Sequence, residues 1–100
     1  MTVLVTLHVA GDPAKLEAYA QEHQEDLKGL IERAQERGAT HHAFYGSGRE
    51  VLVLDEWPDQ ETFEKFFQDE QEIISGMMAQ SDGGEATPVF WQLLDTGDNF

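Results

Sequence analysis

The chain has 100 residues, which is room for one domain. Its 20 acidic residues outnumber six basic ones, and the formal net charge of −14 argues against binding to DNA, RNA or an anionic membrane surface. The absence of cysteine excludes disulfides, thiolate metal sites and thiol nucleophiles. With no signal-peptide pattern and no apolar run long enough to cross a membrane, we expect a cytoplasmic protein.

The first third of the chain predicts a strand followed by a helix. Residues 3–9 (VLVTLHV) are rich in β-branched residues and contain neither Gly nor Pro, as in a buried strand. Asp12 can cap a helix, and Pro13 is suited to its first turn. Apolar residues then recur every three or four positions as far as Arg37, and Gly38 can take the left-handed conformation that ends a helix.

A hairpin is predicted next. Residues 40–45 (THHAFY) and 50–57 (EVLVLDEW) have strand composition, and residues 46–49 (GSGR) form a short loop between them. A loop of this length predicts an antiparallel pair. If all four residues belong to the loop, His42 pairs with Val53.

The remaining sequence predicts a second helix and a fourth strand. The helix over residues 59–80 begins with an Asp-capped turn, and residues 81–87 (SDGGEAT) form a loop. Residues 88–94 (PVFWQLL) form the strand, with proline at its first position, where it is tolerated. We assign residues 1–95 to a single domain and residues 96–100 to a C-terminal tail.

The order strand, helix, strand, strand, helix, strand predicts an α+β fold, the ferredoxin-like βαββαβ arrangement. Right-handed crossovers place the four strands of the antiparallel sheet in the order 4-1-3-2. Both helices then cover one face of the sheet and leave an open face on the other side. An apolar open face needs a cover, and a second copy of the chain is the simplest one, so we expect a homodimer.

Side-chain alternation divides the strand residues between the two faces. The apolar positions of the first strand (Val3, Val5, Leu7 and Val9) suit the helix side. On this interpretation the open face carries a mixture of apolar and polar side chains: Thr6, His8, His42, Phe44, Val51, Val53, Asp55, Phe90, Gln92 and Leu94.

Two stretches carry a resemblance to a known family. They are residues 38–45 leading into the hairpin, and LVLDEWPDQETFEKFF from Leu52 to Phe67, in which a strand ends in Trp57 and Phe63 follows six residues later. With the element order and the Gly11-Asp12-Pro13 start of the first helix, they resemble the dimeric α/β-barrel superfamily, in particular its antibiotic biosynthesis monooxygenase-like domain. The resemblance implies a homodimer whose two sheets close a dimeric α/β barrel with a pocket in each half.

The resemblance also bears on activity. Quinone-forming members of the family, which use O₂ without metal or flavin, place an Asn four residues before this Trp and a Tyr six residues after it. The corresponding positions here hold Val53 and Phe63, so only Trp57 matches. Haem-degrading members use a Trp and a His ten residues apart on the second helix, where this chain has Phe66 and Gly76. We therefore expect no haem, and no other cofactor.

Three polar residues are candidates for proton transfer. His42 is the first candidate for a general base because imidazole exchanges protons near neutral pH, although it can equally be a hydrogen-bonded interface residue. His8 can line the same pocket, two strands away from it. Asp55 interrupts an apolar strand, so it is either a buried, paired carboxylate or a residue at an exposed strand end. Because His8 and His42 have only Asp55 and Gln92 as further ligands, we expect no metal site.

Two functions from different classes remain open. One is a small cofactor-independent monooxygenase- or isomerase-like enzyme that acts on an aromatic or polyketide-like molecule, with His42, His8 or Asp55 moving protons. The other is a non-catalytic homodimeric module that binds a small molecule or a partner. In either case we expect the pocket wall to contain Thr6, Phe44, Val53, Trp57, Phe63, Phe90 and Gln92.

Overall fold

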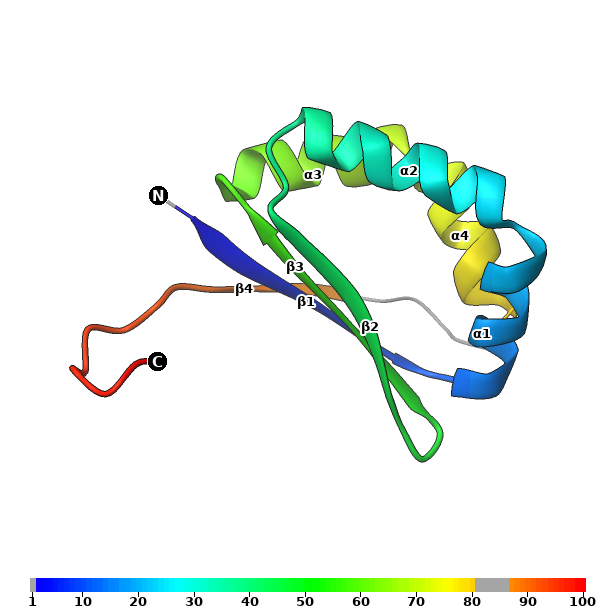
Figure 1. Cartoon of the computed structure of the whole chain (residues 1–100), viewed down its shortest axis with the longest axis horizontal. Helices are drawn as coiled ribbons and strands as arrows, with labels where there is room; N and C mark the ends of the chain where they lie inside the picture. The colour runs from blue at the N-terminus through cyan, green and yellow to red at the C-terminus, as the bar shows by residue number, and fades with distance from the viewer. Residues whose placement is uncertain (1, 81–86) are drawn as a thin grey trace.

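The computed structural model describes residues 2–80 and 87–100, and its helices all lie on one face of the sheet (Figure 1). The elements follow in the order β1 (Val3–Ala10), α1 (Pro13–Glu22), α2 (Gln24–Glu36), β2 (His41–Ser47), β3 (Glu50–Trp57), α3 (Gln60–Asp69), α4 (Gln71–Gln80) and β4 (Thr87–Trp91). The four strands are antiparallel in the order β2-β3-β1-β4, so the predicted ferredoxin-like topology is confirmed.

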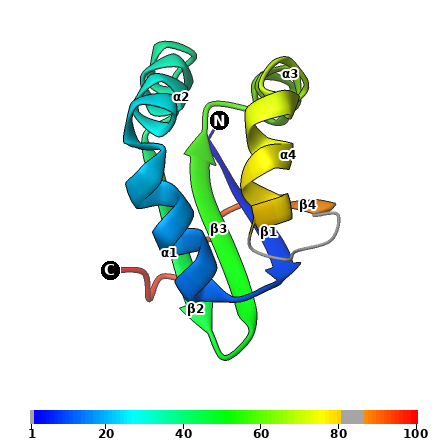
Figure 2. The same ribbon diagram turned by 90° about the vertical axis from the view of Figure 1, so that its right-hand side faces the viewer.

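Each of the two predicted helices is a pair of helices. The first is interrupted at His23, whose φ of −121° and ψ of 37° are not helical. Its Nδ1–H donates to the Tyr19 carbonyl over 2.9 Å, and its ring stacks on that of Tyr19, so the side chain binds the last turn of α1. The second helix is interrupted at Glu70, with φ −104° and ψ 18°. The result is two bent arms over the sheet, an α1–α2 arm and an α3–α4 arm (Figure 2).

The predicted start of each arm is confirmed by its cap. The Asp12 carboxylate accepts from the Ala14 N–H at 2.9 Å with Pro13 in the first turn, and the Asp59 carboxylate accepts from the Thr62 N–H at 2.7 Å. Hydrogen bonding with Thr62 lowers the pKa of the Asp59 carboxyl. That cap therefore stabilises the fold above the carboxyl's ordinary pKa and is lost as the pH falls through the lowered one.

The strand ends differ from the sequence prediction. β2 and β3 extend towards each other until Ser47 pairs with Glu50, which leaves a two-residue turn at residues 48–49. The register therefore moves by two residues, and His42 pairs with Asp55, not with Val53. β4 covers residues 87–91, not 88–94. Most of the predicted loop before β4, residues 81–86, lies outside the described residues.

The main correction concerns the faces of the sheet. As predicted, the alternate residues from Val3 to Val9 face the helices and are buried. Val5 pairs directly with Asp55, and directly paired residues share a face. The predicted set on β2 and β3 does share one face, but that face is the helix side. Six residues predicted for the open face therefore lie on the helix side: His42, Phe44, Val51, Val53, Asp55 and Phe90.

The core lies between the sheet and the two arms. Trp57 and Phe63 are among its largest fully buried side chains, and their rings meet edge to face at 5.6 Å. Aromatic rings from α3 thus pack onto the end of β3 and hold that arm against the sheet. Within residues 2–80 and 87–100, no helix combines the length and apolar character that a membrane span requires.

We expect Gly38→Ala to destabilise the fold more than Gly48→Ala. Both glycines have a positive φ, +104° and +59°, so any Cβ is disfavoured there. At Gly38 the added Cβ would also lie 2.8 Å from Cγ of Pro58, whereas at Gly48 nothing lies within 4 Å. Thermal unfolding should show a loss of about 1 kcal/mol for Gly48→Ala and about 2 kcal/mol or more for Gly38→Ala. Equal losses would contradict the proposed contact.

Candidate functional site

An apolar cavity of about 50 Å³ lies between the sheet and the helical arms. Strands β1, β2 and β3 form its floor, while α2, α3 and α4 form its walls. Apart from His42 and Asp55, the described lining residues carry no ionisable side chain: they are Leu7, Leu30, Ile31, Ala34, Ala39, Phe44, Val53, Trp57, Phe63, Phe66, Phe67, Ile74, Met77 and Met78.

His42 and Asp55 form a hydrogen-bonded pair in the wall of this cavity. They are direct partners across β2 and β3, and Nδ1 of His42 lies 2.6 Å from Oδ1 of Asp55. Because a carboxylate accepts only, Nδ1–H is the donor. The Asp55 carboxylate thus fixes both the tautomer and the orientation of the imidazole.

The second oxygen of Asp55 also has a donor. The indole Nε1–H of Trp57 donates to Oδ2 over 3.3 Å, from two residues further along the same face of β3. Asp55 is only 8% exposed, and such a carboxylate is unfavourable unless its oxygens are paired. His42 and Trp57 supply this pairing, which explains how an acidic residue is accommodated on an otherwise apolar face.

Nε2, the other ring nitrogen of His42, is not bound to a carboxylate as Nδ1 is. The described residues make no hydrogen bond to Nε2, and the His42 side chain keeps 28% of its surface exposed. The Phe44 ring meets the imidazole edge to face at 4.9 Å and restricts its rotation. The arrangement is therefore an oriented imidazole with a carboxylate on one nitrogen and an accepting nitrogen on the other, which is suited to general-base chemistry.

Most of the predicted site residues meet at this cavity. Phe44, Val53, Trp57 and Phe63 line it together with His42 and Asp55. Phe90 of β4 lies beside them, with its ring 5.7 Å from that of Phe63. They meet between the sheet and the helices of one chain, however, and not on the open face as predicted.

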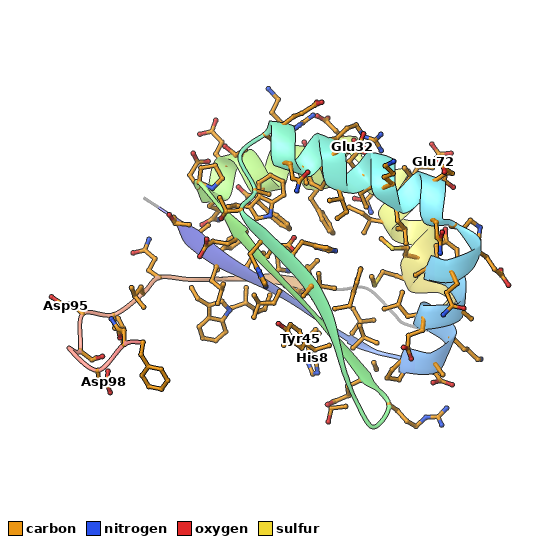
Figure 3. All side chains as sticks on the ribbon, in the orientation of Figure 1. His8, Glu32, Tyr45, Glu72, Asp95 and Asp98 are labelled. Carbon is orange, nitrogen blue, oxygen red and sulfur yellow. The ribbon has the colours of Figure 1, made fainter. Side chains whose placement is uncertain are left out.

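Three predicted site residues are elsewhere. His8 is on the open face, where Nε2 lies 3.5 Å from Oε1 of Glu50 (Figure 3). Thr6 is also on that face, and its Oγ1 accepts from Nε1 of Trp91 at 2.8 Å. Gln92 is exposed beyond the end of β4. None of the three lines the cavity: the pairing of β1 places Thr6 and His8 on the face away from the helices, and Gln92 lies beyond the end of β4.

The contribution of α2 and α4 to the cavity was not predicted from the sequence. Leu30, Ile31 and Ala34 of α2 and Met77 and Met78 of α4 lie on its walls, although their spacing indicates only a helix core. Assigning His42 to the helix side of β2 would have predicted this contribution. A side chain on that side of the sheet meets the apolar stripes of α2 and α4. Within the described part of the chain, no group of three His, Asp or Glu side chains is placed to hold a metal ion.

We expect Asp55→Ala to destabilise the protein by about 1–3 kcal/mol, because it leaves the Trp57 indole N–H without its buried acceptor and the His42 Nδ1–H without a partner. Urea unfolding measures the loss, and the NMR signal of the His42 Nδ1 proton should change with it. The control is Glu56→Ala, which removes the neighbouring carboxylate whose partner, Thr40, is exposed. The hydrogen-bonding argument does not hold if the two variants lose equal stability.

The sequence matches no family model and no curated protein. Solved structures do match it. A conserved protein from Methanosarcina mazei has 19% identity and a TM-score of 0.65, with 92% of each chain covered. A monooxygenase from Streptomyces coelicolor, solved in complex with nanaomycin D, has 17% identity and a TM-score of 0.65 over 95% of this chain and 88% of that one.

A third similar structure is a putative antibiotic biosynthesis monooxygenase from Bordetella bronchiseptica. It has 13% identity and a TM-score of 0.65, and the match covers 93% of this chain and 97% of that chain. The resemblance inferred from residues 38–45 and 52–67 is thus confirmed at the level of the fold: this chain has the fold of the antibiotic biosynthesis monooxygenase-like proteins.

Proposed function

We propose that the protein is a small cofactor-independent monooxygenase- or isomerase-like enzyme that uses His42 as a general base on an aromatic or polyketide-like molecule. The observation that supports this most directly is the 2.6 Å bond between His42 and Asp55 at the wall of an apolar cavity. An oriented base beside an apolar space is what removal of a proton from a weakly acidic, largely apolar molecule requires.

In the proposed reaction, Nε2 of His42 takes a proton from an O–H or an acidic C–H of the substrate. Asp55 keeps hold of Nδ1–H and stabilises the imidazolium that forms. In an oxygenase the substrate anion itself reacts with O₂: for a phenol oxidised to a quinone, one oxygen atom enters the product and the other leaves as water. In an isomerase the same imidazolium returns the proton to a different carbon.

The nature of the wall supports an aromatic ligand. Phe44, Trp57 and Phe63 present rings to the cavity, and no basic side chain other than His42 is among its described lining residues. A permanently anionic substrate would find no counterion there. The Streptomyces coelicolor protein with this fold was solved with nanaomycin D, which is consistent with a ligand of the polyketide class.

The alternative is a non-catalytic module that binds a small molecule or a partner. Two observations favour it: Val53 and Phe63 stand where the quinone-forming proteins have Asn and Tyr, and the cavity of about 50 Å³ is smaller than the 300 Å³ or more typical of ligand pockets. Enzymatic turnover on any phenol, together with its loss on removal of the imidazole, distinguishes the first proposal from the second.

We also propose that two chains associate through their open sheet faces. The face carries the half-exposed Tyr45, Val89 and Trp91, and its acids Glu50 and Glu56 have partners in His8 and Thr40. Residues 12–38 and 59–80, which contain the helices with their caps and junctions, carry 13 of the 20 acidic residues, among them Glu32 and Glu72 (Figure 3). Helix-to-helix approach of two such chains is repulsive, whereas the described strand residues of the open face include only two acids, Glu50 and Glu56, so the open faces can pack together.

For the enzymatic proposal, His42→Ala should lower turnover about 10²–10⁴-fold, the usual contribution of a general base. The measurement is O₂ consumption, or product formation under nitrogen for an isomerase, with a panel of phenols and quinone precursors. The control is His8→Ala, which removes a histidine from the opposite face of the sheet. An equal fall in both variants would end the assignment of His42 as the base.

For the proposed dimer, Leu54→Asn should weaken self-association at least about tenfold by placing an amide in the middle of the open face. Leu54 lies on β3 between Thr6 of β1 and Ala43 of β2, so it is central to that face. Sedimentation equilibrium measures the change, with Gln35→Asn on the exposed surface of α2 as the control. A monomeric wild-type protein of 11.3 kDa at micromolar concentration would overturn the proposal.

A further inference from the structure

Two ion pairs join the helical arms at one end of the cavity. Arg33 of α2 forms a two-point bond with Glu70, from Nε to Oε2 at 2.9 Å and from Nη2 to Oε1 at 2.8 Å. One turn later, Nη2 of Arg37 donates to Oδ2 of Asp69 at 2.7 Å. The hydrogen bond with Glu70 raises the pKa of the Arg33 guanidinium, so Arg33 stays charged.

These ion pairs lie beside the cavity wall. The turn of α2 that carries Arg33 also carries Ala34, and Glu70 follows the segment of α3 that carries Phe66, both of which line the cavity. The guanidinium of Arg37 lies 5.7 Å above the centre of the Phe66 ring. A separation of the ion pairs would therefore move apolar walls of the cavity away from each other.

The other end of the arms is joined differently. There α1 packs directly against α4, and Gly76 leaves space for Tyr19, whose Oη would lie only 3.4 Å from a Cβ at that position. The α3–α4 arm also contains a break at Glu70 itself, where the backbone is not helical. The arms are thus packed at the α1–α4 end and connected by charges at the α2–α3 end, side by side over the sheet (Figure 2).

A ligand of the proposed class requires more space than the structure shows. The cavity holds about 50 Å³, whereas pockets for organic ligands hold roughly 300 Å³ or more. Met77 and Met78 are flexible wall residues that can adjust locally, but a ring system also needs the walls to separate. The two ion pairs differ in exposure: Arg37 is 33% and Asp69 47% exposed, whereas Arg33 is 44% and Glu70 only 11% exposed. The Arg37–Asp69 pair is therefore the weaker one and is screened by salt, and the two-point Arg33–Glu70 bond is the stronger one, reached by water from the arginine side.

We propose that Arg33, Arg37, Asp69 and Glu70 form a latch that holds α2 against the α3–α4 arm and controls the entry of ligand to the His42 cavity. The inference rests on the proposed function in one respect, namely that the cavity takes a ligand. It goes beyond that function by naming the residues that govern access. These residues do not take part in the proton transfer.

The test compares Arg33→Met/Arg37→Met with the control Lys28→Met/Arg49→Met, which changes the net charge equally and leaves the latch intact. Stopped-flow fluorescence measures the association rate of naphthol, a neutral phenol. We expect association about five- to tenfold faster in the latch variant, a factor of the size that the loss of two ion pairs near the surface can supply. In the wild type and the control, the rate should rise as salt is raised from about 20 to about 500 mM, and in the latch variant it should not.

Hydrogen exchange separates failure of the latch from failure of the proposed function. Amides around Glu70 and along α2 should exchange several-fold faster in the latch variant than in the control, whether or not naphthol binds. If naphthol binds no variant but exchange is accelerated, the proposed ligand class fails, while the role of the ion pairs in holding α2 against the α3–α4 arm is supported. Equal exchange and equal association rates in both variants would overturn the latch. The charge swap Arg33→Glu/Glu70→Arg should restore wild-type exchange, which excludes general loosening of the fold as the cause.

Discussion

The antiparallel register between β1 and β3 determines which face of the sheet carries the His42–Asp55 pair of the candidate site. Val5 faces Asp55, and Leu7 faces Val53, so the apolar side of β1 and the Asp55 side of β3 are one surface. Once the helices cover that surface, Asp55 must be buried and must find donors. His42, directly opposite on β2, and Trp57, two residues later on β3, provide them. The site is thus a consequence of strand pairing rather than of a loop.

The sequence predicted the element order, the strand order and the sharing of one face by His42 and Asp55. It did not predict which face, and the reason is physical. Both alternating sets of β3 contain apolar residues, since Leu52 and Leu54 lie on the open face while Val51 and Val53 face the helices. Alternation then establishes two faces without showing which one the helices cover. The presence of polar His42 and Asp55 suggested the wrong one, because their mutual pairing could not be seen in the sequence.

The breaks at His23 and Glu70 have a similar explanation. Apolar periodicity continues through both positions, so it indicates one helix where two exist. The backbone turns because a side chain or a partner favours the turn: the His23 ring binds the Tyr19 carbonyl, and Glu70 binds Arg33, 37 residues away along the chain. Apolar spacing reports neither the polar bond of His23 to the preceding turn nor the contact of Glu70 with the distant Arg33. The bend at Glu70 separates α3 from α4, and both helices contribute side chains to the wall of the cavity.

The charge distribution connects the site to the rest of the molecule. With a net charge of −14, the surface repels anions, and the cavity itself contains a carboxylate. In the proposed reaction the substrate is therefore best neutral on arrival, and its negative charge is generated inside the cavity by transfer of a proton to Nε2 of His42. The Asp55 carboxylate then stabilises the positive charge of the imidazolium, while the substrate anion remains beside the imidazolium. The negative surface charge that keeps anions out thus favours a reaction in which the substrate anion exists only within the cavity. There it lies next to the His42 imidazolium that is formed by the same proton transfer.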